Sequence, residues 1–193
     1  MDDHSLTWET LSRDRAFACE AFEVFTDRVR LPDGRTTRFD FVTEPPSAVI
    51  LPITIDGQVV VLEEYRHAVN RVALGLPGGS AEDEDGDLAA TAVRELYEEA
   101  GYHAGTLEPL AVAEPANGLL NSERHYFKAT DCEPAAETDR DQDESIRVRT
   151  ISYDSLLEQV TSGAVRDERT ITAVLLDHCA DSAPSTSDID VIG

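Results

Sequence analysis

Hydrophobic residues along this chain follow two spacings, one typical of strands and the other typical of helices. Val, Ile and Leu fill 48–55 and 58–62 almost continuously, on either side of the pair Asp56-Gly57. Asp-Gly is a strong signal for a two-residue hairpin turn, and continuous apolar runs are typical of strands buried on both faces. The two segments are therefore expected to be central strands of one sheet.

The part of the chain before these strands shows a looser alternation. Aromatic and β-branched residues alternate partly through 22–31 and more regularly through 36–42. The intervening Leu31-Pro-Asp-Gly-Arg35 is typical of a turn, because Pro fixes one dihedral angle and Gly accepts positive φ. Residues 1–43 are expected to form an amino-terminal β segment that contains an antiparallel hairpin.

A helix is predicted over 87–101. Its apolar residues recur at three- and four-residue spacing and define one face: Leu88, Ala92, Val93, Leu96 and Ala100. Asp87 suits the N-cap, because its carboxylate can accept a hydrogen bond from a first-turn amide. Gly101 suits the left-handed position that closes a helix.

The remainder of the chain alternates strand and helix patterns. Strands are predicted over 107–113, 125–129 and 146–151, and helices over 152–161 and 167–181. One face of the last helix is expected to carry Ile171, Val174, Leu175 and His178. The acidic stretch 131–145 is expected to be an exposed loop, and the small polar residues of 182–193 indicate a disordered tail. Residues 44–181 are thus expected to form one α/β domain.

Three carboxylates of the predicted helix, those of Glu95, Glu98 and Glu99, gather on a different face from the apolar one. Their i, i+3, i+4 spacing brings like charges together, at a cost of roughly a few tenths of a kcal/mol per pair on an exposed helix. A divalent cation would offset this repulsion, and hard cations such as Mg²⁺ prefer oxygen ligands. Arg94 could orient a carboxylate with its planar fork. A solvated acidic helix is the alternative on the carboxylates alone.

The residues around this cluster resemble the Nudix box. The family pattern is Gly, five residues, Glu, seven residues, Arg-Glu-apolar, one residue, Glu-Glu, one residue, Gly-apolar. The matching positions here are Gly79, Arg94-Glu95-Leu96, Glu98-Glu99 and Gly101-Tyr102. The first half departs from the pattern, because Asp85 stands where Glu is expected and one extra residue precedes Arg94. The supporting role of that Glu is left to Asp85, to Glu84 or to neither.

The resemblance implies a fold and a cofactor. The fold is the Nudix α/β/α sandwich, with a mixed sheet between helices and with the amino-terminal hairpin as an extension. The cofactor is Mg²⁺ or Mn²⁺, and the residues that match the family's metal ligands are Glu95, Glu98, Glu99 and the backbone carbonyl of Gly78.

The resemblance also implies catalytic residues. Arg94 would orient the ligands, and Glu98 would act at the metal. In the family a Glu in a later loop serves as general base or as an extra metal contact. Glu144 matches that position best, and Asp143 is the second choice. The implied reaction is hydrolysis of the pyrophosphate bond of a nucleoside diphosphate linked to another group.

Segments outside the box resemble the ADP-ribose pyrophosphatase branch of the family, so the expected reaction converts ADP-ribose to AMP and ribose 5-phosphate. Tyr65 and Arg66 precede the box where that branch contacts substrate. A purely structural role is the alternative for both, since an arginine at the end of a strand often only pairs with a nearby carboxylate. Pro115 follows the box at about the position of a proline in the branch, although the glycine that commonly comes next is absent. Asn117 and Asn121 are candidate contacts to a terminal sugar. Another nucleotide sugar, a dinucleotide or NADH is the alternative substrate.

Two further hypotheses concern the oligomeric state of the protein and whether it is an enzyme or a binding module. In the ADP-ribose branch the amino-terminal sheet often crosses to a second subunit, which is the reason for expecting a homodimer. A packed hairpin within one subunit is the alternative. A Nudix-fold module that binds ADP-ribose without cleaving it would be expected to have a damaged box, whereas Arg94, Glu95, Glu98 and Glu99 are all present.

Composition limits the remaining possibilities. The formal net charge is −23, which argues against nucleic acid as a partner and against an RNA-decapping role. The start of the chain is acidic and polar, and no apolar run reaches the length of a membrane span, so a cytoplasmic protein is expected. The cysteines Cys19, Cys132 and Cys179 lack metal-binding spacing and are expected to be reduced packing residues.

The same charge leads to a prediction about salt. Lys128 is the only lysine among 16 basic residues, and an acidic, lysine-poor composition resembles that of proteins from salt-accumulating microorganisms. Because salt screens repulsion among surface charges, we expect the unfolding temperature to rise between dilute buffer and molar NaCl. Equal unfolding temperatures in the two solutions would contradict this hypothesis.

Overall fold

The computed structural model describes residues 6–136 and 146–182. The chain divides into two compact units, Met1–Pro46 with Ala113–Arg124, and Ser47–Val112 with His125–Gly193. Each unit has its own sheet. None of the helices in the described ranges is both long and apolar enough to cross a membrane.

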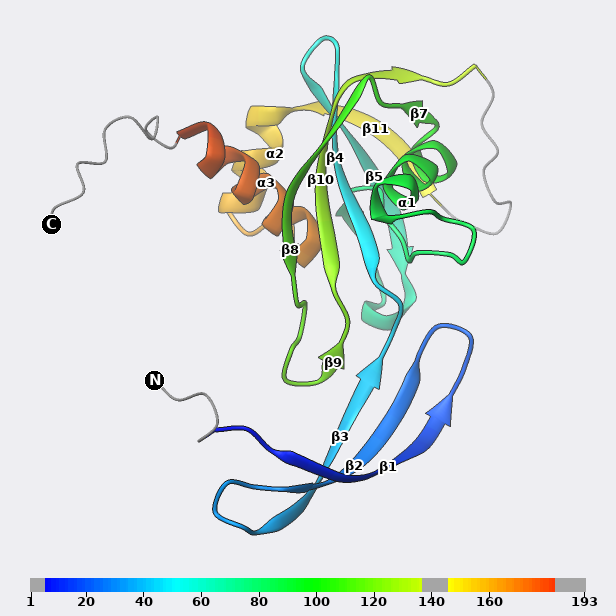
Figure 1. Ribbon diagram of the computed structural model, residues 1–193. Coiled ribbons are helices and arrows are strands. Elements are labelled where there is room, and N and C mark those ends of the chain that lie inside the picture. The colour runs from blue at the N-terminus through cyan, green and yellow to red at the C-terminus, as the bar shows by residue number, and fades with distance from the viewer. Residues whose placement is uncertain (1–5, 137–145, 183–193) are drawn as a thin grey trace, which may run out of the picture. The chain divides into compact units, whose positions relative to one another are not determined.

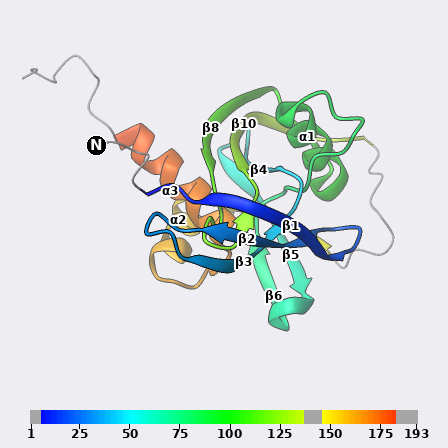
Figure 2. The same ribbon diagram turned by 60° about the horizontal axis from the view of Figure 1, so that its bottom comes forward.

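The first unit is built on a four-stranded sheet with the order β1-β2-β3-β9. Its strands are β1 (Glu9–Ala18), β2 (Glu23–Arg30), β3 (Thr36–Thr43) and β9 (Leu120–Asn121). The predicted hairpin is confirmed, because β2 pairs antiparallel with β3 from Arg30↔Thr36 onward. The alternating pattern did not indicate β1 as a separate strand, and Figure 2 shows it beside β2 and β3.

The second unit contains a seven-stranded mixed sheet with the order β11-β5-β4-β10-β7, in which β6 pairs with β5 and β8 pairs with β10. Its strands are β4 (Ser47–Thr54), β5 (Gln58–Arg66), β6 (Arg71–Gly75), β7 (Tyr102–His103), β8 (Thr106–Ala113), β10 (Arg124–Pro134) and β11 (Ile146–Ser152). The acidic stretch begins later than predicted, because β10 continues to Pro134 and pairs with β7.

Helices cover both faces of this sheet. They are α1 (Leu88–Glu95), continued by a π-helical turn (Leu96–Ala100), α2 (Tyr153–Thr161) and α3 (Glu168–Ser182). Figure 1 shows α1 on one side of the sheet and α2 and α3 on the other. The predicted α/β/α sandwich is therefore confirmed.

The central strands are buried on both faces, as their continuous apolar runs predicted. Residues of one face pack with α1: Ala48, Ile50, Val60, Leu62, Phe127 and Ala129 join Ala92, Leu96 and Ala100 in one cluster. Side chains alternate across a strand, so Val49 and Leu51, each at most 1% exposed, point toward the opposite face. The helix that carries the box, α1 with its π-helical turn, is therefore packed against a well-buried sheet.

The buried face of α3 agrees only in part with the predicted one, since Val174 is buried and Ile171 is half-buried as expected. Leu175 and His178 are exposed, whereas Thr170, Ala173, Val174 and Asp177 are buried. Two of these are polar and have partners, since Lys128 Nζ lies 2.6 Å from Asp177 Oδ1 and the Thr170 hydroxyl donates to Asp167 Oδ2 at 2.7 Å. The apolar pattern failed here because paired polar groups can occupy a core face.

The three cysteines are free thiols in different surroundings. Cys132 is buried in the core, and burial raises its pKa to about 11. Its thiol is therefore inert at neutral pH, as expected of a packing residue. Cys19 and Cys179 are exposed, so the packing role predicted for them is wrong.

Candidate active site

The box segment begins as a loop that is bonded to the start of β4. The backbone N–H groups of Ala48 and Ile50 donate to the carbonyls of Gly79 and Pro77 at 2.9 and 3.0 Å. Gly78 has φ +154°, and a Cβ at this position would lie 2.2 Å from the Ala48 carbonyl oxygen. Only glycine fits so close to a neighbouring backbone.

The predicted box helix is confirmed, including both ends. The Asp87 side chain accepts a hydrogen bond from the Ala90 amide at 2.8 Å, and Gly101 closes the helix with φ +72°. The last turn, Leu96–Ala100, is π-helical, which the spacing of apolar residues did not predict. Glu98 and Glu99 both lie in this turn, and single π-helical turns often occur at functional sites.

Arg94 lies at the centre of the carboxylates. Its Nη1 donates to Glu95 Oε1 at 2.9 Å and to Glu98 Oε2 at 2.8 Å. Its Nε and Nη2 donate to Asp85 at 3.1 and 2.9 Å, and Nη2 also reaches the Ser80 carbonyl at 3.0 Å. These bonds, those with Asp85 first, raise the pKa of Arg94 further above its ordinary value. One guanidinium thus joins the loop to two carboxylates of the helix.

The structure identifies which acid takes the supporting place in the altered half of the box. Asp85, and not Glu84, binds Arg94 through both carboxylate oxygens. The Arg94 guanidinium and then the backbone N–H of Glu82 hold the pKa of Asp85 well below its usual range. Asp85 is therefore ionised at neutral pH and is fully engaged with protein donors.

Glu99 and Glu95 also contact the loop that contains Gly78 and Gly79. Glu99 Oε2 accepts a hydrogen bond from the Gly78 N–H at 2.7 Å. Glu95 is 9% exposed, and its carboxylate lies so near Gly79 that a Cβ there would be 2.3 Å from Oε1. The loop and the helix thus pack so closely that Gly79 has no space for a side chain.

The donor chemistry of Glu95, Glu98 and Glu99 fits a hard divalent cation, since all three offer carboxylate oxygens within a short stretch of one helix. In the described residues no three Asp, Glu, His or Cys side chains already converge around one point. The carboxylates instead face Arg94 and the Gly78 amide. Glu98 keeps 45% of its side chain exposed, so it is accessible to a ligand from solvent.

Tyr65 and Arg66 contact their own neighbours on the β5–β6 hairpin. The Tyr65 hydroxyl donates to Asn70 Oδ1 at 2.7 Å, and Arg66 Nη2 lies 2.7 Å from Glu64 Oε2. Arg66 also lines a cavity of about 10 Å³, too small for a phosphate group. The structure therefore leaves their role as substrate contacts a prediction.

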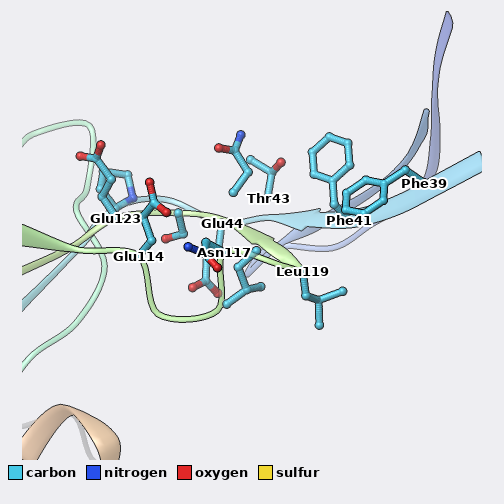
Figure 3. Close-up of a pocket in the computed structure, with 12 residues that line it drawn as sticks. Phe39, Phe41, Thr43, Glu44, Glu114, Asn117, Leu119 and Glu123 are labelled. Atoms are coloured by element: carbon cyan, nitrogen blue, oxygen red, sulfur yellow. The ribbon is translucent and has the colours of Figure 1, made fainter. Parts of the chain in front are cut away.

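Asn117 and Asn121 lie in the first unit, where they line a pocket of about 550 Å³. Pro115 belongs to the same loop. Figure 3 shows the rings of Phe39 and Phe41 at one end of the pocket and carboxylates nearer the other. The carboxylates are those of Glu44, Glu114 and Glu123.

Sequence reasoning missed the two phenylalanines as pocket residues. Their alternation was interpreted only as the apolar face of a strand, although the same alternation places Thr43 beside them on that face. Glu144 and Asp143, the proposed general bases, lie outside the described residues.

Comparison with known proteins agrees with this geometry. Residues 43–174 match the family model of the NUDIX domain. The chain belongs to the Nudix family and is a Nudix hydrolase. Its curated relatives include the ADP-ribose pyrophosphatase of Bacillus subtilis (strain 168), 26% identical over 88% of this chain and 92% of the relative. The methanol dehydrogenase activator of Bacillus methanolicus is 27% identical over 86% of this chain and 90% of the relative.

A solved structure supports the fold independently. The crystal structure of an ADP compounds hydrolase superimposes with a TM-score of 0.80, covering 92% of this chain and 96% of that chain. Sequence identity between the two is 20%. At this identity the match shows the fold.

Proposed function

We propose that this protein hydrolyses the pyrophosphate bond of ADP-ribose, giving AMP and ribose 5-phosphate, with Mg²⁺ or Mn²⁺ as cofactor. The observation that carries the proposal is the single guanidinium of Arg94 bonded to Glu95 and Glu98 beside Glu99. The single positive charge of Arg94 offsets only part of the negative charge of these three carboxylates, and the remaining repulsion weakens the helix. The carboxylates suit a cation that also binds phosphate oxygens.

Some residues of the box would bind that cation, and others orient the residues that bind it. Glu95, Glu98 and Glu99, with the backbone carbonyl of Gly78, would be its ligands. When bound, a divalent cation polarises phosphoryl oxygens and lowers the pKa of water. Arg94 keeps the Glu95 and Glu98 carboxylates oriented. The Gly78 N–H orients Glu99 in the same way.

Glu144 is our proposed general base, and Asp143 is the second choice. A carboxylate in this role would accept the proton of the attacking water, which typically contributes about 10² to 10⁴ in rate. Only the ionised form of a carboxylate can accept that proton. Glu144→Gln and Asp143→Asn would separate the two candidates, because the amide that replaces the true base cannot take up the proton.

The pocket of the first unit, taken by itself, has the chemistry to bind a sugar or a base. Its carboxylates would repel phosphate groups but accept hydrogen bonds from sugar hydroxyls or from the amino group of a base. The Phe39 and Phe41 rings offer apolar surface, and Asn117 and Asn121 offer amide groups. Phosphate groups need cationic contacts instead, and Arg66 is our proposed contact for a phosphate group or the ribose. The Tyr65 ring would offer apolar surface beside it.

The names of the relatives support the substrate proposal in part. One relative carries the name ADP-ribose pyrophosphatase, which agrees with the proposed reaction. Another relative is named for activation of methanol dehydrogenase, so the printed names do not agree on one substrate. Another nucleotide sugar, a dinucleotide or NADH is the alternative. The two relatives are similar to this chain to nearly the same degree, so the substrate must be measured.

We further propose that the chain forms a homodimer in the cytoplasm. Trp8 and Phe17, on β1 or next to it, are each at least half exposed, at 50% and 53%. Large exposed aromatic side chains favour a partner surface. Light scattering at several protein concentrations tests the dimer, and a monomer at all of them would contradict it.

A substrate panel tests the proposed reaction directly. We expect ADP-ribose to be cleaved faster than other nucleotide sugars, dinucleotides and NADH, with Mg²⁺ or Mn²⁺ in high salt and phosphatase-coupled phosphate release as the measurement. EDTA should abolish the signal, since the carboxylates alone supply no Lewis acid. Preferred cleavage of another compound would keep the chemistry and replace the substrate. Tight ADP-ribose binding without cleavage would show a sensor instead.

A further inference from the structure

Asp85 is held from several sides besides Arg94. Its N–H donates to the Glu82 carbonyl at 3.1 Å, and its Oδ2 accepts from the Glu82 N–H at 3.0 Å. These two bonds close a turn over 82–85. The Asp85 side chain is only 8% exposed. Its carboxylate is therefore held by the backbone of its own turn as well as by Arg94.

Thr91 ties this turn to the box helix. Its hydroxyl donates to Asp85 Oδ2 at 2.9 Å, and the whole residue is buried, at 0% exposed. Thr91 and Arg94 lie three residues apart, so they stand on neighbouring positions of one helical face. The buried Thr91 hydroxyl thus holds the Asp85 carboxylate, and this carboxylate in turn holds the Arg94 guanidinium. The family pattern does not specify the residue at this position.

The loop spacing explains how an aspartate can occupy this place. Asp is one methylene group shorter than the Glu of the family pattern, whereas one additional residue separates it from Arg94. One residue adds up to about 3.8 Å of chain, enough to bring a shorter acid within reach. Gly86 lies in this added stretch and is exposed, and a Cβ placed on it would have nothing within 4 Å.

We propose that Asp85 and Thr91 are positioning residues for Arg94, and that the extra loop residue compensates for the shorter acid. Asp85 orients the guanidinium, and the guanidinium orients Glu95 and Glu98. In this proposal Asp85 and Thr91 act through Arg94 and are not themselves ligands of the cation. This inference rests on the proposed function, because it assumes that Glu95 and Glu98 are metal ligands.

The compensation is tested by a double-mutant cycle. The proteins are the wild type, Asp85→Glu, a deletion of Gly86, and the combination of both changes, which restores the family spacing. We expect each single change to weaken Mn²⁺ binding and lower kcat by about 10- to 100-fold, as is typical for partners of metal ligands. The combination should recover most of both losses. Losses that simply add would overturn the compensation.

The role of Thr91 is tested with a matched pair of variants. Thr91→Val keeps the buried volume but lacks the hydroxyl, whereas Thr91→Ser keeps the hydroxyl. We expect Mn²⁺ to bind about tenfold more weakly to Thr91→Val than to Thr91→Ser, measured by titration without substrate. Thr91→Ser has a smaller side chain, so its unfolding temperature should fall more. Equal Mn²⁺ affinity in the two variants would overturn the positioning role.

These measurements separate the two proposals. A wild-type chain that binds Mn²⁺ but cleaves no nucleotide would overturn the proposed reaction and leave the positioning test intact. A wild-type chain that binds no Mn²⁺ would overturn both. Glu84→Gln, next to Asp85 on the same turn, serves as the control and should match the wild type in affinity and in kcat.

Discussion

Glu98→Gln is expected to lower turnover by about a thousandfold, because a metal-assisted site supplies several kcal/mol and each 1.36 kcal/mol is a factor of ten. The substitution removes one negative charge from the group that would hold the cation. The fold should be unaffected, since the Glu98 side chain is 45% exposed and a Gln oxygen can still accept the bond from Arg94. The measurements are kcat with saturating substrate and the unfolding temperature.

Glu108→Gln is the matched control for this variant. Glu108 is an exposed carboxylate on β8, so its replacement makes the same change in net charge outside the box. It should leave kcat unaltered. If Glu98→Gln retained wild-type turnover, the assignment of Glu98 to the catalytic and metal-binding groups would be wrong.

Gly79→Ala is expected to lower kcat by about a hundredfold, the loss that a displacement of about 1 Å at a site can cause. The added Cβ would lie 2.3 Å from Glu95 Oε1 and 2.6 Å from its Cδ. Because Glu95 is nearly buried and bonded to Arg94, its carboxylate must move away from its place beside Glu98. Steady-state kinetics and Mn²⁺ titration measure the effect.

Gly86→Ala is the control for the glycine substitution. It lies in the same loop, yet nothing approaches a Cβ there within 4 Å. We expect wild-type kcat and Mn²⁺ affinity. A fully active Gly79→Ala enzyme would show that the Glu95 position near Gly79 is not needed for turnover.

The sequence was most informative where structure is local. Asp87 and Gly101 marked the ends of the box helix, and the i, i+3, i+4 spacing of the three glutamates placed them in one short stretch. These features depend on capping and on the helical period, which involve residues a few positions apart. The apolar runs before the box likewise predicted central strands, because burial on both faces leaves few polar positions.

The sequence was least informative where polar groups are paired over long distances. The buried face of α3 includes Asp177, whose partner Lys128 lies on β10. An apolar pattern cannot show that an aspartate is buried, because burial of a charge requires a partner from another element. The pocket of the first unit was also not predicted, because its lining residues come from strand β3 and loop 113–124, which are far apart in the sequence.

The sequence by itself determined the family, the box helix and its three carboxylates, since each depends on residue type and short spacing. Only the tertiary structure decided between Asp85, Glu84 and neither as the support of Arg94. That choice depends on the turn over 82–85, the buried Thr91 hydroxyl and the two hydrogen bonds that Arg94 donates to Asp85. Hydrogen bonds require both distance and direction, and a loop with one added residue changes both in a way that spacing alone does not reveal.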